Sequence, residues 1–578
     1  MKSKNLKMLT ENLNIASYIL IESKIPLDAS QPTDLLSQFP NERPYKYTIS
    51  TLILPTKEPL VLSVGQIIAN LLTHEEVTDL YNKEYIQLNS KRLGSTVKFY
   101  LHWKPKSILG NDDNEKYIEL KPDFLLFPKD LGQNFAEIFK YKTQLSTETE
   151  DFSYPSSRPT NFSSSYSLQF CLLTLRPIAN DQITSIPRNI QLLNISDRPS
   201  QGQIVYTMTS PYGLASSQLY KNSLHVGHIS KVAFRTSRKM LGWYKNEYIF
   251  LVNSTYKKGE EGSPVFNEYL EMIGMVIGNI KPYKEDAVGF NVCISTLPIM
   301  DLLFKVSAYQ SGINIWDLTA SNFRPFVKSF PIKGVLSRVV RIITGNSIGS
   351  GVLINAKGYI LTNRHVLKDH KGSLFTIEMS YEGQIDFEYY NAEVCVISKG
   401  DLDIALLKIT KDLSDRALKI LKQTKRFLDH PIDVRYLRGN EVYGIGYTFT
   451  QLNSVDFRTM ITKGYLSKVI IHKNRPFLIL TTCPVYNGFS GGAIVSNRGE
   501  FLGLITYNFT HSKKGILNDL SFSYCYSIFK ELLDVIEEKN EEKLKELLLW
   551  NYEDKYIDRM ACSQTVEYVP KFEIESKL

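Results

Sequence analysis

Short runs of β-forming residues fill the C-terminal half of this 578-residue chain. Turn sequences separate them, for example Asn-Ala-Lys-Gly at 355–358 and Asn-Arg-Gly at 497–499. Strands this short and closely spaced favour an all-β barrel fold, which also removes exposed strand edges. The predicted strands are Ser337–Ile343, Gly351–Ile354, Phe375–Met379, Ala392–Ile397, Ile404–Ile409 and Phe477–Leu480. After them, apolar residues recur on one face of Ser527–Glu538, which predicts a helix, and a charged helix is expected at Glu541–Leu549.

Composition excludes several classes of partner. The net charge of +8 is spread along a long chain without a dense basic block, so we expect no nucleic-acid partner. No apolar run reaches about 18 residues, so we expect no membrane span. The six cysteines lack metal-ligand spacing, which predicts free thiols in a reducing compartment and no metal site. Residues 1–17 lack the apolar core of a secretory signal.

The segment Asn487–Gly492 predicts a nucleophilic serine, Ser490. A serine that attacks a carbonyl needs a tight glycine-flanked turn, which exposes the hydroxyl and aims backbone N–H groups at the developing oxyanion. The sequence Gly-x-Ser-Gly-Gly meets this need and resembles the nucleophile turn of trypsin-like serine proteases. The N–H groups of Gly488 and Ser490 are the predicted oxyanion hole. Phe489 departs from the pattern, because trypsin has aspartate there and Deg/HtrA enzymes often have asparagine.

A serine nucleophile also needs a neighbouring base and a carboxylate that orients the base. His365 lies in a short turn after an apolar strand, and Asp403 directly precedes the apolar run Ile404–Leu407. Both segments resemble the histidine and aspartate segments of Deg/HtrA-type proteases. Asp401 is the less favoured acid, because the family places the acid immediately before Ile-Ala. The predicted triad is therefore His365, Asp403 and Ser490, in the trypsin-like order and without a cofactor.

The resemblance extends to the strand Leu502–Asn508, which is similar to the strand that lines the specificity pocket. By that match Thr506 and Asn508 would border the pocket. Neither supplies a carboxylate, so a preference for Lys or Arg is not supported, and a small or polar side chain is expected.

The N-terminal half reads as a degenerate copy of the C-terminal half. Its strand-like runs include Thr48–Leu54 and Lys98–Trp103, and a Ser/Thr/Pro/Asn-rich loop is predicted at 146–167. When similar segments of the two halves are aligned, Gly65 falls opposite His365, Gln169 opposite Asp403 and Glu261 opposite Ser490. Ser263 is not taken as a nucleophile, because no suitable histidine and acid segments precede it.

The predicted architecture is mainly β, with two tandem trypsin-like double β-barrel domains of which the N-terminal one is degenerate. We predict that this domain covers 1–310, with a linker at 311–331. The active domain is expected at 332–538, and a helical tail at 539–578. The alternative for the N-terminal half is an unrelated β domain.

The last three residues, Ser576, Lys577 and Leu578, match the address read by the peroxisomal import receptor. Together with the protease motifs, they make the chain similar to the peroxisomal leader-peptide-processing proteases. That resemblance implies a serine endopeptidase of the peroxisomal matrix. It would remove N-terminal targeting leaders from imported proteins and process fatty-acid β-oxidation enzymes. Self-cleavage and a homo-oligomer are also implied. The alternative is a protease-derived peptide-binding or chaperone module with little or no proteolytic activity.

Overall fold

The computed structural model describes two units, which meet in sequence near residue 327 and are each described by themselves. The described residues are 16–24, 45–54, 60–69, 71–103, 116–128, 171–178, 195–196, 199–211, 223–235, 246–254, 257, 259–280, 289–307, 332–344, 347–368, 374–381, 387–398, 402–429, 433–448, 459–472, 474–511 and 515–538. The predicted loop at 146–167, the linker at 311–331 and the tail at 539–578 lie outside them. No helix within these ranges combines the length and hydropathy needed to cross a membrane.

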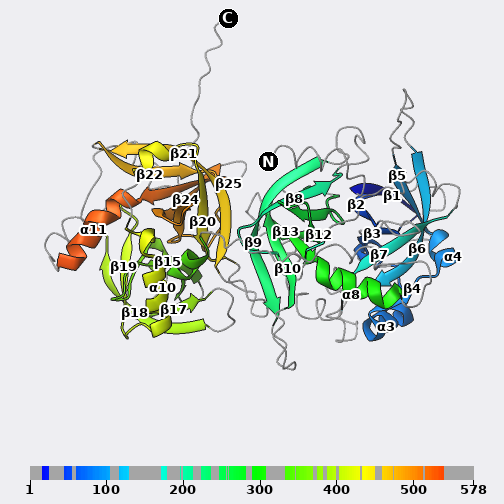
Figure 1. Ribbon diagram of the computed structural model, residues 1–578, viewed down its shortest axis with the longest axis horizontal. Coiled ribbons are helices and arrows are strands. Elements are labelled where there is room, and N and C mark those ends of the chain that lie inside the picture. Colours follow the sequence, from blue (N-terminus) through cyan, green and yellow to red (C-terminus); the bar gives the residue numbers. More distant parts are fainter. Residues whose placement is uncertain are drawn as a thin grey trace, which may run out of the picture. The chain divides into compact units, whose positions relative to one another are not determined.

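The C-terminal unit contains two closed six-stranded barrels (Figure 1). The first follows the order β14-β15-β16-β19-β18-β17 and the second the order β20-β21-β22-β25-β24-β23, with antiparallel pairing. The first barrel comprises β14 (Val339–Thr344), β15 (Ser347–Leu353), β16 (Tyr359–Thr362), β17 (Leu374–Ser380), β18 (Phe387–Ile397) and β19 (Ala405–Ile409). The second comprises β20 (Glu441–Gly446), β21 (Met460–His472), β22 (Arg475–Thr481), β23 (Ala493–Ser496), β24 (Phe501–His511) and β25 (Gly515–Cys525).

Short helices connect and flank these barrels. They are η3 (Lys333–Arg338), η4 (His365–Leu367), α10 (Asp415–Gln423), η5 (Lys425–Phe427), η6 (Val434–Leu437) and α11 (Tyr526–Glu538). The predicted helix at Ser527–Glu538 is confirmed as α11. The prediction of a strand from Ser337 is wrong at its start, because β14 begins two residues later. The backbone stays helical through Arg338, whose buried guanidinium donates to the end of α10.

One apolar core joins the two barrels of this unit. It includes residues of the first barrel and residues of the second, among them Val352, Leu361, Leu406, Ile445, Leu504 and Tyr524. A second cluster fills the first barrel alone. Because the shared core fixes the barrels against each other, residues at the strand ends between them are held in a defined geometry.

The N-terminal unit repeats this design. Its first sheet runs β4-β6-β5-β1-β2-β3-β7, and an added β6–β7 pairing closes a six-stranded ring that leaves β4 outside. The strands are β1 (Ala16–Ser23), β2 (Tyr45–Leu54), β3 (Leu60–Val64), β4 (Tyr85–Gln87), β5 (Val97–Trp103), β6 (Lys116–Leu126) and β7 (Leu172–Pro177). Three helices accompany them, α2 (Gln66–Ala69), α3 (His74–Lys83) and α4 (Ser90–Gly94).

The second barrel of the N-terminal unit follows the order β10-β13-β12-β11-β8-β9. It comprises β8 (Ile204–Thr209), β9 (Ser223–Arg235), β10 (Asn246–Asn253), β11 (Pro264–Asn267), β12 (Met272–Ile280) and β13 (Phe290–Ser295), followed by helix α8 (Thr296–Ser307). When the strands are matched in chain order and β4 is left out, each ring has the same neighbour order as its counterpart in the C-terminal unit. The predicted pair of double β-barrels is therefore confirmed.

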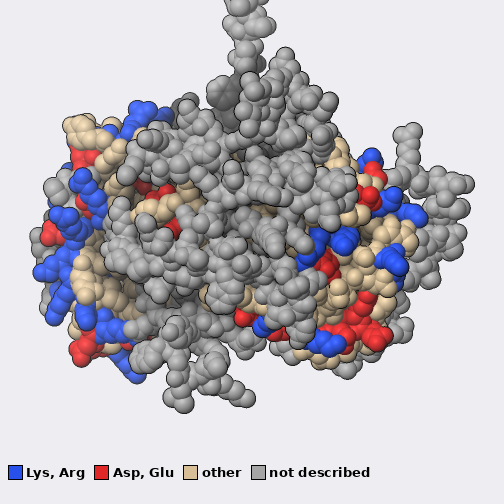
Figure 2. Space-filling view, turned by 45° about the vertical axis from the view of Figure 1, so that its right-hand side comes forward, with Lys and Arg blue, Asp and Glu red and all other residues tan. Residues whose placement is uncertain are grey.

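The described surface is mixed in charge. Figure 2 shows basic and acidic side chains interspersed over the described part of one face. The described cysteines are Cys171, Cys293, Cys395, Cys483 and Cys525, and all are free thiols. The free state was expected from their irregular spacing in the sequence.

Candidate active site

The candidate site of the C-terminal unit begins at the end of β16. The chain leaves the strand at Thr362, turns through Asn363 and Arg364, and enters η4 with His365 as its first residue. Val366 and Leu367 are buried in the core of the first barrel. Because these two side chains anchor the short helix, the His365 ring is left near the strand ends, with 20% of its side chain exposed.

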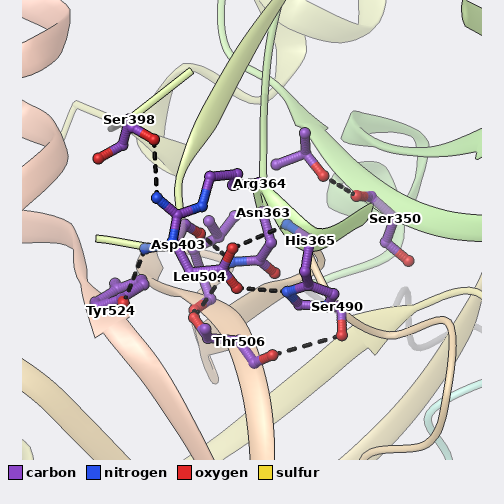
Figure 3. Close-up of polar contacts among 11 residues, drawn as sticks. Ser350, Asn363, Arg364, His365, Ser398, Asp403, Ser490, Leu504, Thr506 and Tyr524 are labelled. Atoms are coloured by element: carbon purple, nitrogen blue, oxygen red, sulfur yellow. Dashed lines mark hydrogen bonds and ion pairs between the residues drawn. The ribbon is translucent and has the colours of Figure 1, made fainter. Parts of the chain in front are cut away.

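Asp403 holds His365 through both carboxylate oxygens. Oδ1 accepts the backbone N–H of His365 at 2.9 Å, and Oδ2 makes a short hydrogen bond with Nδ1 of the ring (Figure 3). The backbone of Asp403 is fixed in turn, since its N–H donates to the Tyr524 hydroxyl at 3.1 Å and its carbonyl accepts Asn363 Nδ2 at 2.9 Å. The predicted acid and base are thus brought together, whereas Asp401 lies outside the described residues.

The electrostatics of Asp403 favour its ionised form. Burial acts to raise the pKa of this carboxyl, but the hydrogen bonds and charge of His365, with a further contribution from the charge of Arg364, hold the pKa below its ordinary value. Arg364 itself donates to the Ser398 carbonyl at 2.9 Å (Figure 3). A carboxylate that remains charged at neutral pH can stabilise a positive imidazolium beside it.

Ser490 lies on the other side of the His365 ring from Asp403 (Figure 3). Its hydroxyl donates to the Thr506 carbonyl at 3.5 Å, a long hydrogen bond. Among the described residues, no hydrogen bond joins Ser490 Oγ to His365; in catalytic sites without substrate this bond is often long or poorly aligned and forms only in the reacting complex. The structure therefore places all three predicted residues in one cluster at the junction of the two barrels.

The turn that carries Ser490 has the conformation expected of an oxyanion hole. Gly488 has φ +96° and Gly491 has φ +82°, backbone angles that glycine adopts readily. A Cβ on Gly491 would lie 2.1 Å from the Ser350 carbonyl oxygen, so this position also needs glycine for space. Among the described residues, no backbone carbonyl accepts the N–H of Gly488 or Ser490.

Phe489 is fully buried and packs edge-on against Tyr486, with ring centroids 5.9 Å apart. Its N–H donates to the Tyr486 carbonyl and its own carbonyl accepts the Gly492 N–H, both at 2.8 Å. The unusual residue before the serine is therefore an apolar anchor of the turn.

The predicted pocket residue Thr506 is 1% exposed. Its hydroxyl donates to the Leu504 carbonyl at 3.1 Å and accepts Asn363 Nδ2 at 3.5 Å, so it faces the His365 and Asp403 segment (Figure 3). Asn508 pairs with Ser521 across β24 and β25, and its side chain lies outside the described part. Their role in specificity stays a prediction.

Sequence reasoning missed several residues that complete the site. They are Ser350, Asn363, Arg364 and Tyr524. The Ser350 and Asn363–Arg364 positions belong to the motifs that identified the histidine segment, so a signal was present. Tyr524 had no local signal, because it comes from the last strand of the second barrel. No group of three or more metal-binding side chains occurs among the residues with described positions.

The nucleophile turn has a close counterpart in the N-terminal unit. Gly259 and Gly262 have φ +93° and +86°, similar to Gly488 and Gly491. The backbone hydrogen bonds also correspond. In the N-terminal unit, the Gly262 N–H donates to the Val276 carbonyl at 2.8 Å and the Val276 N–H to the Ser263 carbonyl at 2.9 Å. In the C-terminal unit, the Gly491 N–H donates to the Ile505 carbonyl and the Ile505 N–H to the Gly492 carbonyl, both at 2.9 Å. This register places Glu261 where Ser490 lies, as the sequence comparison predicted.

The other two predicted counterparts are wrong. The same side-chain hydrogen bond links the second and third strands of each unit: Ser63 Oγ to Ser50 O, and Thr362 Oγ1 to Ser350 O. His365 lies three residues after Thr362, and the residue three after Ser63 is Gln66, so Gln66 and not Gly65 corresponds to His365. In the pairing of β3 with β7, Ser63 lies opposite Leu173, and in the pairing of β16 with β19, Thr362 lies opposite Ala405. Asp403 is two residues before Ala405, and Cys171 is two residues before Leu173. Cys171, and not Gln169, therefore occupies the Asp403 position, and Gln169 lies outside the described residues.

Comparison with known proteins agrees with this geometry. Residues 349–504 match the model of the trypsin-like peptidase domain. DegS, a serine endoprotease of Salmonella typhimurium, is 26% identical over 272 residues, which cover 44% of this chain and 68% of DegS. A probable periplasmic serine endoprotease, DegP-like, of Buchnera aphidicola is 32% identical over 164 residues, 28% of this chain and 30% of that protein.

A third relative is the peroxisomal leader peptide-processing protease of Homo sapiens. It is 23% identical over 328 residues, covering 53% of this chain and 50% of the human protein. The chain spans about half the length of this relative and of several DegS proteins. Residues 349–504 are thus similar to the trypsin-like peptidase domain and to the Deg serine endoproteases.

Proposed function

We propose that the chain is a cofactor-independent serine endopeptidase whose catalytic residues are His365, Asp403 and Ser490. The observation that carries the proposal is the placement of Ser490 beside a histidine that is hydrogen-bonded to a partly buried aspartate with a lowered pKa. An isolated serine turn would not need this arrangement. The trypsin-like domain match supports the same reaction class.

We propose a role for each group. Ser490 Oγ would attack the scissile carbonyl while His365 takes its proton through Nε2, since Nδ1 faces Asp403. The N–H groups of Gly488 and Ser490 would stabilise the oxyanion of the tetrahedral intermediate. His365 would then protonate the leaving amine, and a water molecule activated by the same histidine would release the acyl group. Asp403 would hold the ring in the required tautomer.

We further propose that the substrates are N-terminal targeting leaders of proteins imported into the peroxisome. Two observations support this finer proposal: the terminal Ser576-Lys577-Leu578, and the similarity to a human protein that bears this function in its name. An N-terminal fluorescent fusion should reach peroxisomes, and removal of the last three residues should leave it elsewhere. Unchanged peroxisomal import after that removal would contradict the proposed address.

The test of the reaction uses the full chain and a leader-bearing precursor protein. The wild-type protein should release the leader, and Ser490→Ala should reduce the rate by roughly 10⁴-fold or more. Sequencing the new N-termini that only the wild-type protein produces would define the cleaved bond. Equal cleavage by both proteins would exclude Ser490 as the nucleophile. Absence of cleavage, together with tight binding of the precursor, would favour the peptide-binding alternative.

A further inference from the structure

We propose that Ser350 is a positioning residue, which fixes the nucleophile turn and so aims the two N–H groups that receive the oxyanion. The inference rests on the proposed function, because it concerns the rate of that reaction. Ser350 lies on β15 of the first barrel and is fully buried. It is separated in sequence from Ser490 and does not belong to the proposed triad.

Ser350 makes hydrogen bonds with its hydroxyl, its N–H and its carbonyl. The hydroxyl donates to the Gly488 carbonyl at 2.6 Å and accepts the Tyr447 N–H at 2.9 Å. The backbone N–H donates to the Ser490 carbonyl at 2.9 Å. The carbonyl accepts Thr362 Oγ1 at 2.7 Å, which links it to the end of the strand that leads to His365. One buried residue therefore ties the histidine segment to the serine turn.

The hydroxyl controls the peptide plane that follows Gly488. A glycine turn has weak intrinsic preference for one conformation, because glycine visits positive and negative φ with similar ease. Fixing the Gly488 carbonyl and the Ser490 carbonyl holds the backbone on both sides of Phe489. Preorganised N–H groups stabilise a developing oxyanion well only when they point at its position beforehand. Loss of the hydroxyl would leave the Gly488 carbonyl and the Tyr447 N–H without this buried partner.

The N-terminal unit supplies an independent observation. Ser50 Oγ donates to the Gly259 carbonyl at 2.7 Å and accepts the Ser210 N–H at 3.0 Å, the same pair of bonds that Ser350 makes. Gly259 keeps the positive φ of Gly488 although Glu261 replaces the nucleophile. The serine bond thus accompanies the shape of the turn where there is no triad. The hydroxyl bond is therefore not a consequence of the catalytic residues. The backbone bonds of the two serines differ, since the Ser50 N–H donates to the Gly259 carbonyl at 3.0 Å and the Ser350 N–H to the Ser490 carbonyl at 2.9 Å.

The two serines provide a matched pair of variants in the full chain. Ser350→Ala should lower kcat roughly 10- to 100-fold, because the oxyanion donors lose their alignment. KM should change by less than about threefold, because the lost interaction acts mainly in the transition state. Ser50→Ala removes the corresponding pair of bonds from the unit without a triad and should leave both constants at their wild-type values.

The control for folding is Ser350→Cys, which keeps a side chain of similar size but forms weaker hydrogen bonds. It should also lower kcat, and it replaces Ser350→Ala if that variant does not fold. Wild type and Ser490→Ala are measured in the same assay. Absence of wild-type hydrolysis would defeat the proposed function itself. If the wild type is active, then wild-type kcat in the folded Ser350 variants, or an equal fall in Ser50→Ala, would overturn the positioning role alone.

Discussion

At the scale of single residues, Asp403 could be predicted from the sequence, but the residues that hold it in place could not. Its position directly before an apolar strand identified it from the sequence. Its partners Asn363, Arg364 and Tyr524 come from two other segments, and only folding brings them to it. A sequence motif records the residues next to the acid in the chain, and it does not record the residues that contact the acid in the folded protein.

The lowered pKa of Asp403 gives a prediction for stability against pH. Its ionised form is favoured in the native state, so it stabilises the fold above its unfolded pKa of about 4. This contribution is lost as pH falls below that value through the lower native pKa. Asp403→Asn removes the charge but keeps the shape. The difference in free energy of unfolding between wild type and variant should therefore be largest near neutral pH and shrink below about pH 4.

The measurement is urea unfolding of both proteins at several pH values. The variant should also lose roughly 10⁴-fold in kcat, because the neutral amide favours the wrong histidine tautomer. A stability difference that stays constant from pH 7 to about pH 3 would show that Asp403 has no lowered native pKa.

At the scale of elements, the start of β14 shows where propensity fails. The β-branched run after Ser337 favours a strand, yet η3 continues through Arg338. The reason is tertiary, because the Arg338 guanidinium donates to the carbonyls of Leu421 and Thr424, at the end of α10, at 3.0 and 3.1 Å. Helix ends leave carbonyls unpaired, and a buried arginine satisfies them. No pattern in the sequence indicated that this arginine would point inward.

Arg338 is accordingly predicted to be a large contributor to stability. It is 4% exposed, donates also to Thr424 Oγ1 and to two carbonyls of β15 and the following turn, and lies 5.0 Å from the centre of the Phe427 ring. Arg338→Met should destabilise the C-terminal unit by about 3 kcal/mol or more, because several buried acceptors lose their donor.

Arg341→Met is the matched control for this experiment. Arg341 is 26% exposed and pairs with Glu378 at 3.3 Å, so its loss should cost less than about 1 kcal/mol. Urea unfolding of both variants gives the comparison. Equal stability of the two variants would contradict a structural role for the Arg338 hydrogen bonds.

At the scale of the whole molecule, the two units share one topology but differ at every triad position. The repeat was visible in the sequence, and the match at Glu261 was correct because two glycines with positive φ mark the turn. The matches at Gly65 and Gln169 failed by one and two residues. The register of two paired strands is set by their hydrogen bonds, and runs of similar apolar residues do not reveal it. The correct counterparts of His365 and Asp403 could therefore be found only in the structure.

The N-terminal unit should remain inactive even with a restored triad. Gln66→His, Cys171→Asp and Glu261→Ser, in a Ser490→Ala background, would supply the missing residues. One feature argues against hydrolysis. Cys171 is fully buried, and a carboxylate placed there would lose its hydration.

The measurement is hydrolysis of the leader-bearing precursor by the restored protein, beside Ser490→Ala alone. The two rates should be equal, and circular dichroism should show that the restored protein is folded. A rate above the Ser490→Ala background would mean that the N-terminal unit is a latent protease, inactive only because three side chains are missing. Equality in a folded protein would mean that more than the three missing side chains separates the two units. Hydrolysis would then be confined to the C-terminal unit, in which Ser350 is hydrogen-bonded to the turn that carries Ser490.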